Sequence, residues 1–157
     1  MSRKHTAKEF DKSNKWLAIG VDLAKYDNTV VGITEDGEVQ IIERISTTDL
    51  LELASEIQPT TFAIEPCNGA NILSLNLQAQ GHEVKTVSGA AVKDWVKVHL
   101  AGHKTDRNDA LALALAHLSR DTMLKPIRTK TVAECGCSPS MQRESNLLNV
   151  VHRFWCH

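Results

Sequence analysis

Two short apolar segments of this chain each end in an acidic residue. WLAIGVD ends at Asp22, and TFAIEP carries Glu65 directly before Pro66. Both segments have the length and the apolar composition expected of a core strand. When two such strands lie side by side and parallel, their carboxyl ends meet at the same edge of one sheet. The sequence therefore predicts an α/β fold in which the two acids lie close together.

The remaining segments predict the order of elements around these two strands. Residues 16–22, 29–34 and 39–45 read as three successive strands, and Asp36-Gly37 in the second connection is typical of a hairpin turn. Alternating elements follow, and we expect helices from Ser46 to before Pro59 and over 71–80, 89–99 and 106–119, with strands over 61–65 and 83–87. This order matches a ribonuclease-H-like fold, a mixed five-stranded sheet flanked by helices, and it is also compatible with other α/β folds.

Two more acids open the last predicted helix. Asp106 and Asp109 are three residues apart in KTDRNDALALALA, so they share one helical face. Acids are also favoured in the first turn of any helix, and Asp106 alone suits an N-cap. If all four carboxylates converge, their mutual repulsion requires divalent cations. Mg²⁺ or Mn²⁺ is the expected occupant, and a phosphodiester is the expected substrate.

Composition and charge narrow the class of protein. A chain of 157 residues with 42% hydrophobic and 4% aromatic residues predicts one domain with an aliphatic core. We find no apolar stretch long enough to span a membrane and no secretory signal, so we expect a cytoplasmic location. Residues 16–65 carry ten acids and two basic residues, whereas residues 1–15 carry five basic residues and two acids. An acidic centre flanked by basic segments suits a polyanionic partner, although the basic segments alone fit ordinary solvated surface.

Three motifs in order carry a family resemblance. GVDLAK, AIEPCNGAN and HKTDRNDALALA resemble the DEDD motif of the insertion sequence 110 transposases, which are related to the Piv and MooV DNA invertases. The resemblance covers about residues 16–130. It implies a RuvC-like domain in which Asp22, Glu65, Asp106 and Asp109 are the metal-binding and catalytic acids, with Mg²⁺ or Mn²⁺ as cofactor. It also implies DNA as substrate, a structured guide RNA as partner and a homo-oligomeric assembly.

Basic residues near these motifs are the expected nucleic-acid contacts. They are Lys25, Lys93, Lys97, Lys104 and Arg107. Around the central domain at 16–130 we expect a flexible basic arm at 1–15 and an atypical tail at 131–157.

The tail departs from the family pattern. From about Val132 the helical periodicity fades, and we expect residues after about 131 to be encoded out of frame or to end a truncated copy. The serine-bearing C-terminal domain of the family is then absent, together with the nucleophile for strand exchange. The tail also holds residues of zinc-ligand type, which are Cys135, Cys137, His152, Cys156 and His157. The C-x-C spacing is poor for zinc, so we favour a tail without a metal site, and we expect Cys67 to be a free thiol.

Several functions remain open at this point. The first is a metal-binding transposase domain. The second is a stand-alone endonuclease of the Holliday-junction resolvase type that uses the same four acids to activate water. The third is a non-catalytic nucleic-acid-binding fragment that regulates a full-length transposase. A sugar-kinase or actin-like ATPase ranks last, because LAKYDNT after Asp22 lacks the glycines of a phosphate loop.

Overall fold

Three antiparallel strands open the fold: β1 (Trp16–Asp22), β2 (Asn28–Thr34) and β3 (Val39–Ile45). They belong to a computed structural model that describes residues 10–100, 103–118 and 126–127. The Asp36-Gly37 turn between β2 and β3 forms as predicted, with Gly37 at φ 82° and its N–H donating to the Thr34 carbonyl. The predicted order of elements is confirmed within these residues.

The second half alternates helices and strands. Its elements are α1 (Thr47–Glu56), β4 (Thr61–Ile64), α2 (Ala70–Ala79), β5 (Glu83–Val87), α3 (Gly89–His99), α4 (Asp106–Leu118) and β6 (Pro126–Ile127). The sheet order is β3-β2-β1-β4-β5-β6, with β1, β4 and β5 parallel to one another. The expected ribonuclease-H-like arrangement is confirmed, and β6 adds a two-residue strand antiparallel to β5 that the sequence did not predict.

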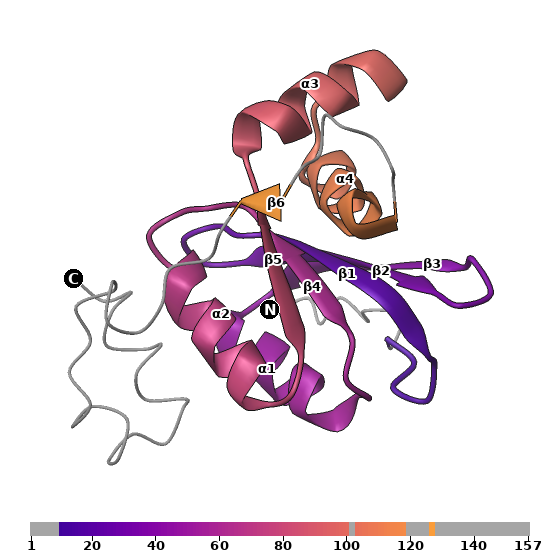
Figure 1. Cartoon of the computed structure of the whole chain (residues 1–157), viewed down its shortest axis with the longest axis vertical. Helices are drawn as coiled ribbons and strands as arrows, with labels where there is room; N and C mark the ends of the chain where they lie inside the picture. The colour runs from indigo at the N-terminus through magenta and orange to yellow at the C-terminus, as the bar shows by residue number, and fades with distance from the viewer. Residues whose placement is uncertain (1–9, 101–102, 119–125, 128–157) are drawn as a thin grey trace, which may run out of the picture.

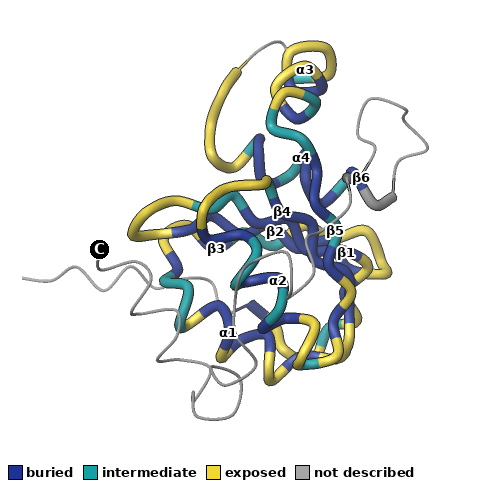
Figure 2. Tube along the Cα trace, turned by 60° about the vertical axis from the view of Figure 1, so that its left-hand side comes forward, coloured by how far each residue is buried: buried dark blue, intermediate teal, exposed yellow. Residues whose placement is uncertain are grey.

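Helices cover both faces of the sheet (Figure 1). α1 and α2 lie on one face, and α4 lies on the other with α3 packed against it. Alternate residues of β1 divide between these faces, since Ile19 and Val21 join the cluster formed with α1 and α2 whereas Gly20 meets α4. β1, β2 and β4 are buried along most of their length (dark blue in Figure 2), which places the core between these strands and the helices on the two faces.

Side-chain capping differs among the helix starts. Ser46 caps α1 as predicted, because its Oγ accepts from the Asp49 N–H at 3.0 Å. Ser88 occupies the N-cap position of α3 without a side-chain cap bond. At α4 the cap is Thr105 rather than Asp106, since the Thr105 Oγ1 accepts from the Asn108 N–H at 3.1 Å. The Asp106 carboxylate therefore does not cap the helix.

The predicted arm at residues 1–15 is described only from Phe10 onward, and there it packs on the sheet. The Phe10 ring stacks on Trp16 with centroids 4.0 Å apart, and Phe10 is part of the core. The rest of the arm, the 131–157 tail and the tail residues of zinc-ligand type lie outside the described residues. Cys67, which is described, is exposed and free. No helix in the described part of the chain is long and apolar enough to cross a membrane.

Candidate metal centre

Asp22 and Glu65 meet at one edge of the sheet because their strands are adjacent, parallel and in register. Val21 of β1 pairs with Ile64 of β4, so the next residue of each strand is one of the two acids. Asp22 lies on the same face of β1 as Gly20, which is the face that α4 covers. Glu65 likewise continues the face of Ala63, which packs in the cluster formed with α3 and α4. Both carboxylates therefore point to the α4 side.

The start of α4 brings the other two acids to the same edge. Asp106 and Asp109 lie in its first turn. Asp109 is buried at 7% exposure, whereas Asp106 is exposed. The helix approaches β1 closely at Gly20, where a Cβ would meet the Ala114 amide nitrogen at 2.5 Å and overlap the Ala110 carbonyl oxygen. The missing side chain at Gly20 thus sets how near Asp109 comes to Asp22.

The charges of neighbouring acids act on Asp22 and Asp109. Burial, followed by the charges of Asp106, Asp109 and Glu65, raises the pKa of Asp22 to about 6, while Lys104 opposes the shift. Burial also raises the pKa of Asp109, with an added contribution from Asp106, and Lys104 and Lys93 oppose it. The other three acids are therefore near enough to Asp22 for their charges to disfavour its ionised form.

The donor set fits a hard divalent cation, although the side chains do not form a finished cage. Among the described residues, no three Asp, Glu, His or Cys side chains are gathered tightly enough to hold a metal ion. The Asp109 Oδ1 is nevertheless buried and has no hydrogen-bond partner in the described structure. Such an orphaned acceptor among repelling carboxylates is the situation that Mg²⁺ or Mn²⁺ relieves, since these ions prefer oxygen ligands.

The five predicted nucleic-acid residues occupy different surroundings. Lys93 on α3 and Lys104 before α4 act on the acids by charge. Lys97 lies one helical turn beyond Lys93, so both occupy one side of α3. Lys25 lies in the β1–β2 connection with its Nζ 5.0 Å from the Tyr26 ring centroid. The fifth, Arg107, turns from the acids and forms an ion pair with Glu43 of β3.

Asn28 holds in place the β1–β2 connection, which follows Asp22. This residue is fully buried at the start of β2, and its Oδ1 accepts from the Ala24 N–H at 3.1 Å. Its Nδ2 donates to the Ile45 carbonyl and to the Thr47 Oγ1, each at 3.1 Å. One amide therefore ties the segment after Asp22 to the end of β3 and the start of α1.

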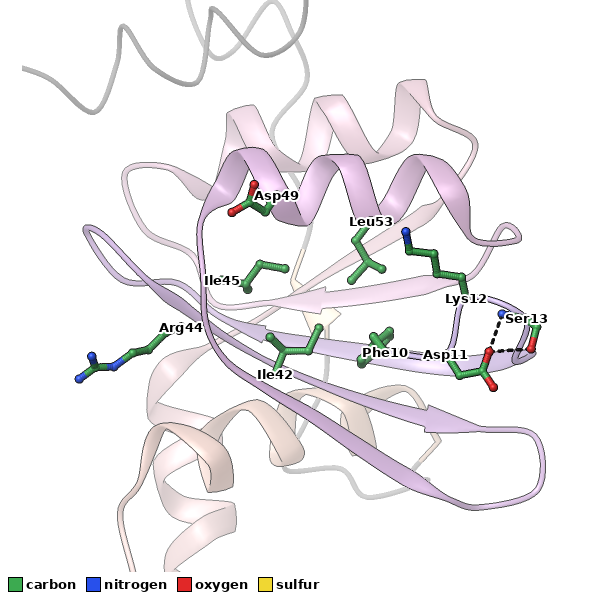
Figure 3. A pocket seen from close by; sticks show the side chains of 9 residues that line it. All are labelled: Phe10, Asp11, Lys12, Ser13, Ile42, Arg44, Ile45, Asp49 and Leu53. Carbon is green, nitrogen blue, oxygen red and sulfur yellow. Dashed lines mark hydrogen bonds between the residues drawn. The ribbon is translucent and has the colours of Figure 1, made fainter. Parts of the chain in front are cut away.

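A pocket of about 890 Å³ lies elsewhere, between residues 10–13, β3 and α1 (Figure 3). Its apolar lining, which includes Phe10, Ile42 and Leu53, belongs to the core cluster on the α1 side of the sheet. Arg44 extends away from the other lining residues in Figure 3. The pocket is thus on the opposite face from the four carboxylates and takes no part in their site.

Sequence patterns did not identify Gly20, Asn28 or Thr105 as residues that shape the site. Gly20 precedes Asp22 by two residues, which is the spacing of one strand face and the only available signal. Asn28 lies just before the strand predicted over 29–34, and Asn at such a position is common in turns. Thr105 was not identified as the cap of the last helix, because the neighbouring Asp106 is an equally suitable N-cap residue.

Comparisons with known proteins agree with the resemblance carried by the motifs. A family model described as a transposase, of the insertion-sequence-110 DEDD type, matches residues 19–134. The transposase for insertion sequence element IS1111A of Coxiella burnetii is 30% identical over 136 residues, which is 84% of this chain and 36% of that protein. The transposase for IS1328 of Yersinia enterocolitica is 30% identical over 105 residues, 67% of this chain and 30% of that protein.

A third relative is also similar to this chain. A probable family 20 transposase of Pseudomonas aeruginosa is 28% identical over 125 residues, which is 80% of this chain and 35% of that protein. The chain spans about a third of the length of these relatives. From the extent of the family match, this chain belongs to the insertion-sequence-110 family of DEDD transposases.

Proposed function

We propose that this chain serves DNA transposition as a domain that binds divalent metal ions and presents nucleic acid to them. The observation that carries the proposal is the meeting of Asp22 and Glu65 at the ends of two parallel strands in register, with Asp106 and Asp109 delivered by α4. Burial, together with repulsion from the other three acids, raises the pKa of Asp22 to about 6, which is typical of an acidic site that gains from a cation.

Asp22, Glu65, Asp106 and Asp109 are the residues that would hold Mg²⁺ or Mn²⁺. When bound, such an ion polarises a phosphodiester and stabilises charge on the leaving oxygen. The chain's own contribution is to fix the ligands: Asp109 is buried at the α4–β1 contact, and Asp22 ends a core strand. Exposed Asp106 completes the set on the solvent side.

The nucleic acid would approach over the basic side chains next to the acids. Lys93 and Lys104 already act on the carboxylates by charge, and Lys97 extends the positive side of α3 by one turn. A phosphate group placed near the acids would be held by these lysines, and its negative charge would be balanced jointly by lysine and metal. We include DNA, a structured guide RNA and further copies of the chain among the partners.

The role proposed for this chain does not include strand exchange. The resemblance implies a serine nucleophile in a second domain, and the four acids act on the phosphate rather than replace that serine. We therefore assign metal and nucleic-acid binding to this part of the protein. Metal-dependent cleavage of branched DNA by the purified chain alone would instead favour a resolvase-type endonuclease.

Calorimetric titration with Mn²⁺ tests the metal site. The unsubstituted protein is expected to bind, and Glu65→Gln and Asp109→Asn are each expected to lower the affinity by about tenfold or more. Glu52→Gln is the matched control, because Glu52 is an exposed acid on α1 at the opposite face of the sheet. Equal Mn²⁺ affinity in all four proteins would refute a metal site at these acids.

A further inference from the structure

The Glu65 side chain occupies the space where a side chain of residue 89 would lie. Gly89 is the first residue of α3. A Cβ built on it would overlap the Glu65 Oε1 and lie 2.5 Å from the Glu65 Cδ and 3.3 Å from its Cγ. Three successive atoms of Glu65 therefore rest against the Gly89 backbone.

The arrangement of the strands explains this contact. β4 and β5 are parallel neighbours with Ile64 paired to Thr86, so the chain leaving β5 toward α3 passes beside the residue that follows β4. Glu65 is that residue. Its carboxylate meets the start of α3, where backbone N–H groups and the helix dipole favour a negative charge.

Backbone conformation does not require glycine at position 89. The glycines with positive φ in the described structure are Gly37 and Gly81, and Gly89 is not among them. Glycine is also a poor helix former compared with alanine. Gly89 matters to the site because it has no side chain, which leaves room for the Glu65 carboxyl group.

We propose that Gly89 is a positioning residue, which directs the Glu65 carboxylate toward Asp22 and α4 by leaving space for it at the start of α3. The inference rests on the proposed metal-binding function. Glu65 has three rotatable side-chain bonds, so a defined carboxylate position needs a neighbouring surface that selects one arrangement. Gly89 supplies that surface, and it has no side chain that would occupy the space of the Glu65 carboxylate.

The substitution Gly89→Ala separates positioning from folding. The atoms that the new methyl group meets are the far end of a flexible side chain, so Glu65 can move aside without disturbing the core. Alanine also favours the helix. We expect an unchanged or higher melting temperature in EDTA together with a loss of about tenfold in Mn²⁺ affinity. Ala90→Ser, at the next and exposed position of α3, is expected to change neither.

A double-substitution cycle ties the effect to Glu65. Glu65→Asp retracts the carboxylate by one methylene group and is expected to weaken Mn²⁺ binding alone. Because both changes disturb the same ligand, Gly89→Ala is expected to add little in the Glu65→Asp background. Full additivity of the two losses would contradict a shared cause, as would an unchanged Mn²⁺ affinity in Gly89→Ala.

A metal-free measurement keeps this inference apart from the proposed function. In the unsubstituted protein without metal, nuclear Overhauser contacts are expected between the Gly89 α-protons and the Glu65 γ-protons. Their absence in the folded protein overturns the role of Gly89 whatever the metal data show. If Glu65→Gln leaves Mn²⁺ affinity unchanged while these contacts are present, the metal site fails and the placement of Glu65 by Gly89 stands.

Discussion

Gly20 of β1 lies directly beneath Ala110 of α4, close enough that any side chain on Gly20 would run into the Ala110 carbonyl group. The atoms on the α4 side of this contact are backbone atoms, so neither element has a flexible group that can move away. Two residues farther along β1 is Asp22, and one residue before Ala110 is Asp109. The packing contact and the pair of acids are therefore set by the same approach of helix to strand.

Gly20→Ala is expected to destabilise the fold by about 1–3 kcal/mol, because overpacking at a backbone contact forces the elements apart. It is also expected to weaken Mn²⁺ binding, since α4 carries Asp109 away from Asp22. Urea unfolding followed by circular dichroism measures the first effect, and calorimetry measures the second. Glu52→Gln is the control, because Glu52 is an exposed side chain on α1, on the opposite face of the sheet from α4. Stability equal to that of the unsubstituted protein would contradict the tight contact at Gly20.

The pKa of Asp22, raised from 3.8 to about 6, makes stability depend on pH. The folded state binds the proton of the Asp22 carboxyl group more tightly than the unfolded state does, so protonation of Asp22 stabilises the fold. This stabilisation is fully present below pH 3.8 and is lost as the pH rises through about 6. Asp22→Asn removes this loss. In EDTA the variant is expected to match the unsubstituted protein at pH 4 and to exceed it at pH 7.5 by on the order of 1 kcal/mol after solvent screening.

Thermal unfolding at the two pH values measures that difference. Glu52→Gln, on the far face of the sheet, is expected to show the same offset from the unsubstituted protein at both pH values. A stability gain from Asp22→Asn that is the same at pH 4 and pH 7.5 would mean that ionisation of Asp22 is not its source.

Most of the fold could be predicted because its signals are local. Apolar runs of strand length, the Asp36-Gly37 turn and the Ser46 cap each act within a few residues, and the structure contains all three. The convergence of Asp22 with Glu65 was also accessible, since it needs only that β1 and β4 be parallel neighbours. Pattern and topology together were sufficient for these features.

Features that depend on contacts between distant segments escaped prediction. β6 consists of two residues that pair with Thr86 and Val87, and two residues carry no periodicity. β3 contains an irregularity, where Asn28 pairs with Ile45 but Val30 pairs with Ile42, and Arg44 there has φ 63°. No residue pattern in VQIIERI predicts such a bulge. The close approaches at Gly20 and Gly89 are similar, because the absence of a side chain has meaning only beside its neighbour in space.

Asn28 is expected to be among the most sensitive polar positions outside the acidic cluster. Asn28→Ala leaves the Ala24 N–H and the Ile45 carbonyl without their side-chain partner, at a cost of about 2–4 kcal/mol. Thr47→Val is the comparison, because it removes one partner of the Asn28 amide and keeps the bond to Ala24. Urea unfolding is expected to rank the Asn28→Ala loss well above the Thr47→Val loss. Equal losses would mean that the bonds to Ala24 and Ile45 together contribute nothing.

His82 is expected to carry its ring proton on Nε2. The ring is buried at 4% exposure, and its Nδ1 accepts from the Thr60 N–H at 3.1 Å. The Nε2 lies 2.9 Å from the Ala54 carbonyl oxygen, which can only accept, so the proton belongs on Nε2. Long-range ¹⁵N–¹H correlation spectra at pH 7 identify the tautomer directly. A proton found on Nδ1 would contradict the bond to Thr60, and His82→Ala is expected to cost about 2–3 kcal/mol.

Lys93 and Lys97 are expected to contribute separately to DNA affinity. Each lies exposed on one side of α3, and Lys93 already acts on Asp109 by charge. If each contacts a phosphate, Lys93→Gln and Lys97→Gln each reduce the slope of log affinity against log salt by about 1. Fluorescence anisotropy with a labelled duplex at several salt concentrations measures this slope. Lys15→Gln is the control, because Lys15 precedes β1 at the end of the strand opposite to Asp22 and is expected to leave the slope unchanged. If all three variants lower the slope equally, binding follows total charge alone, and α3 has no special part in guiding DNA to the acids.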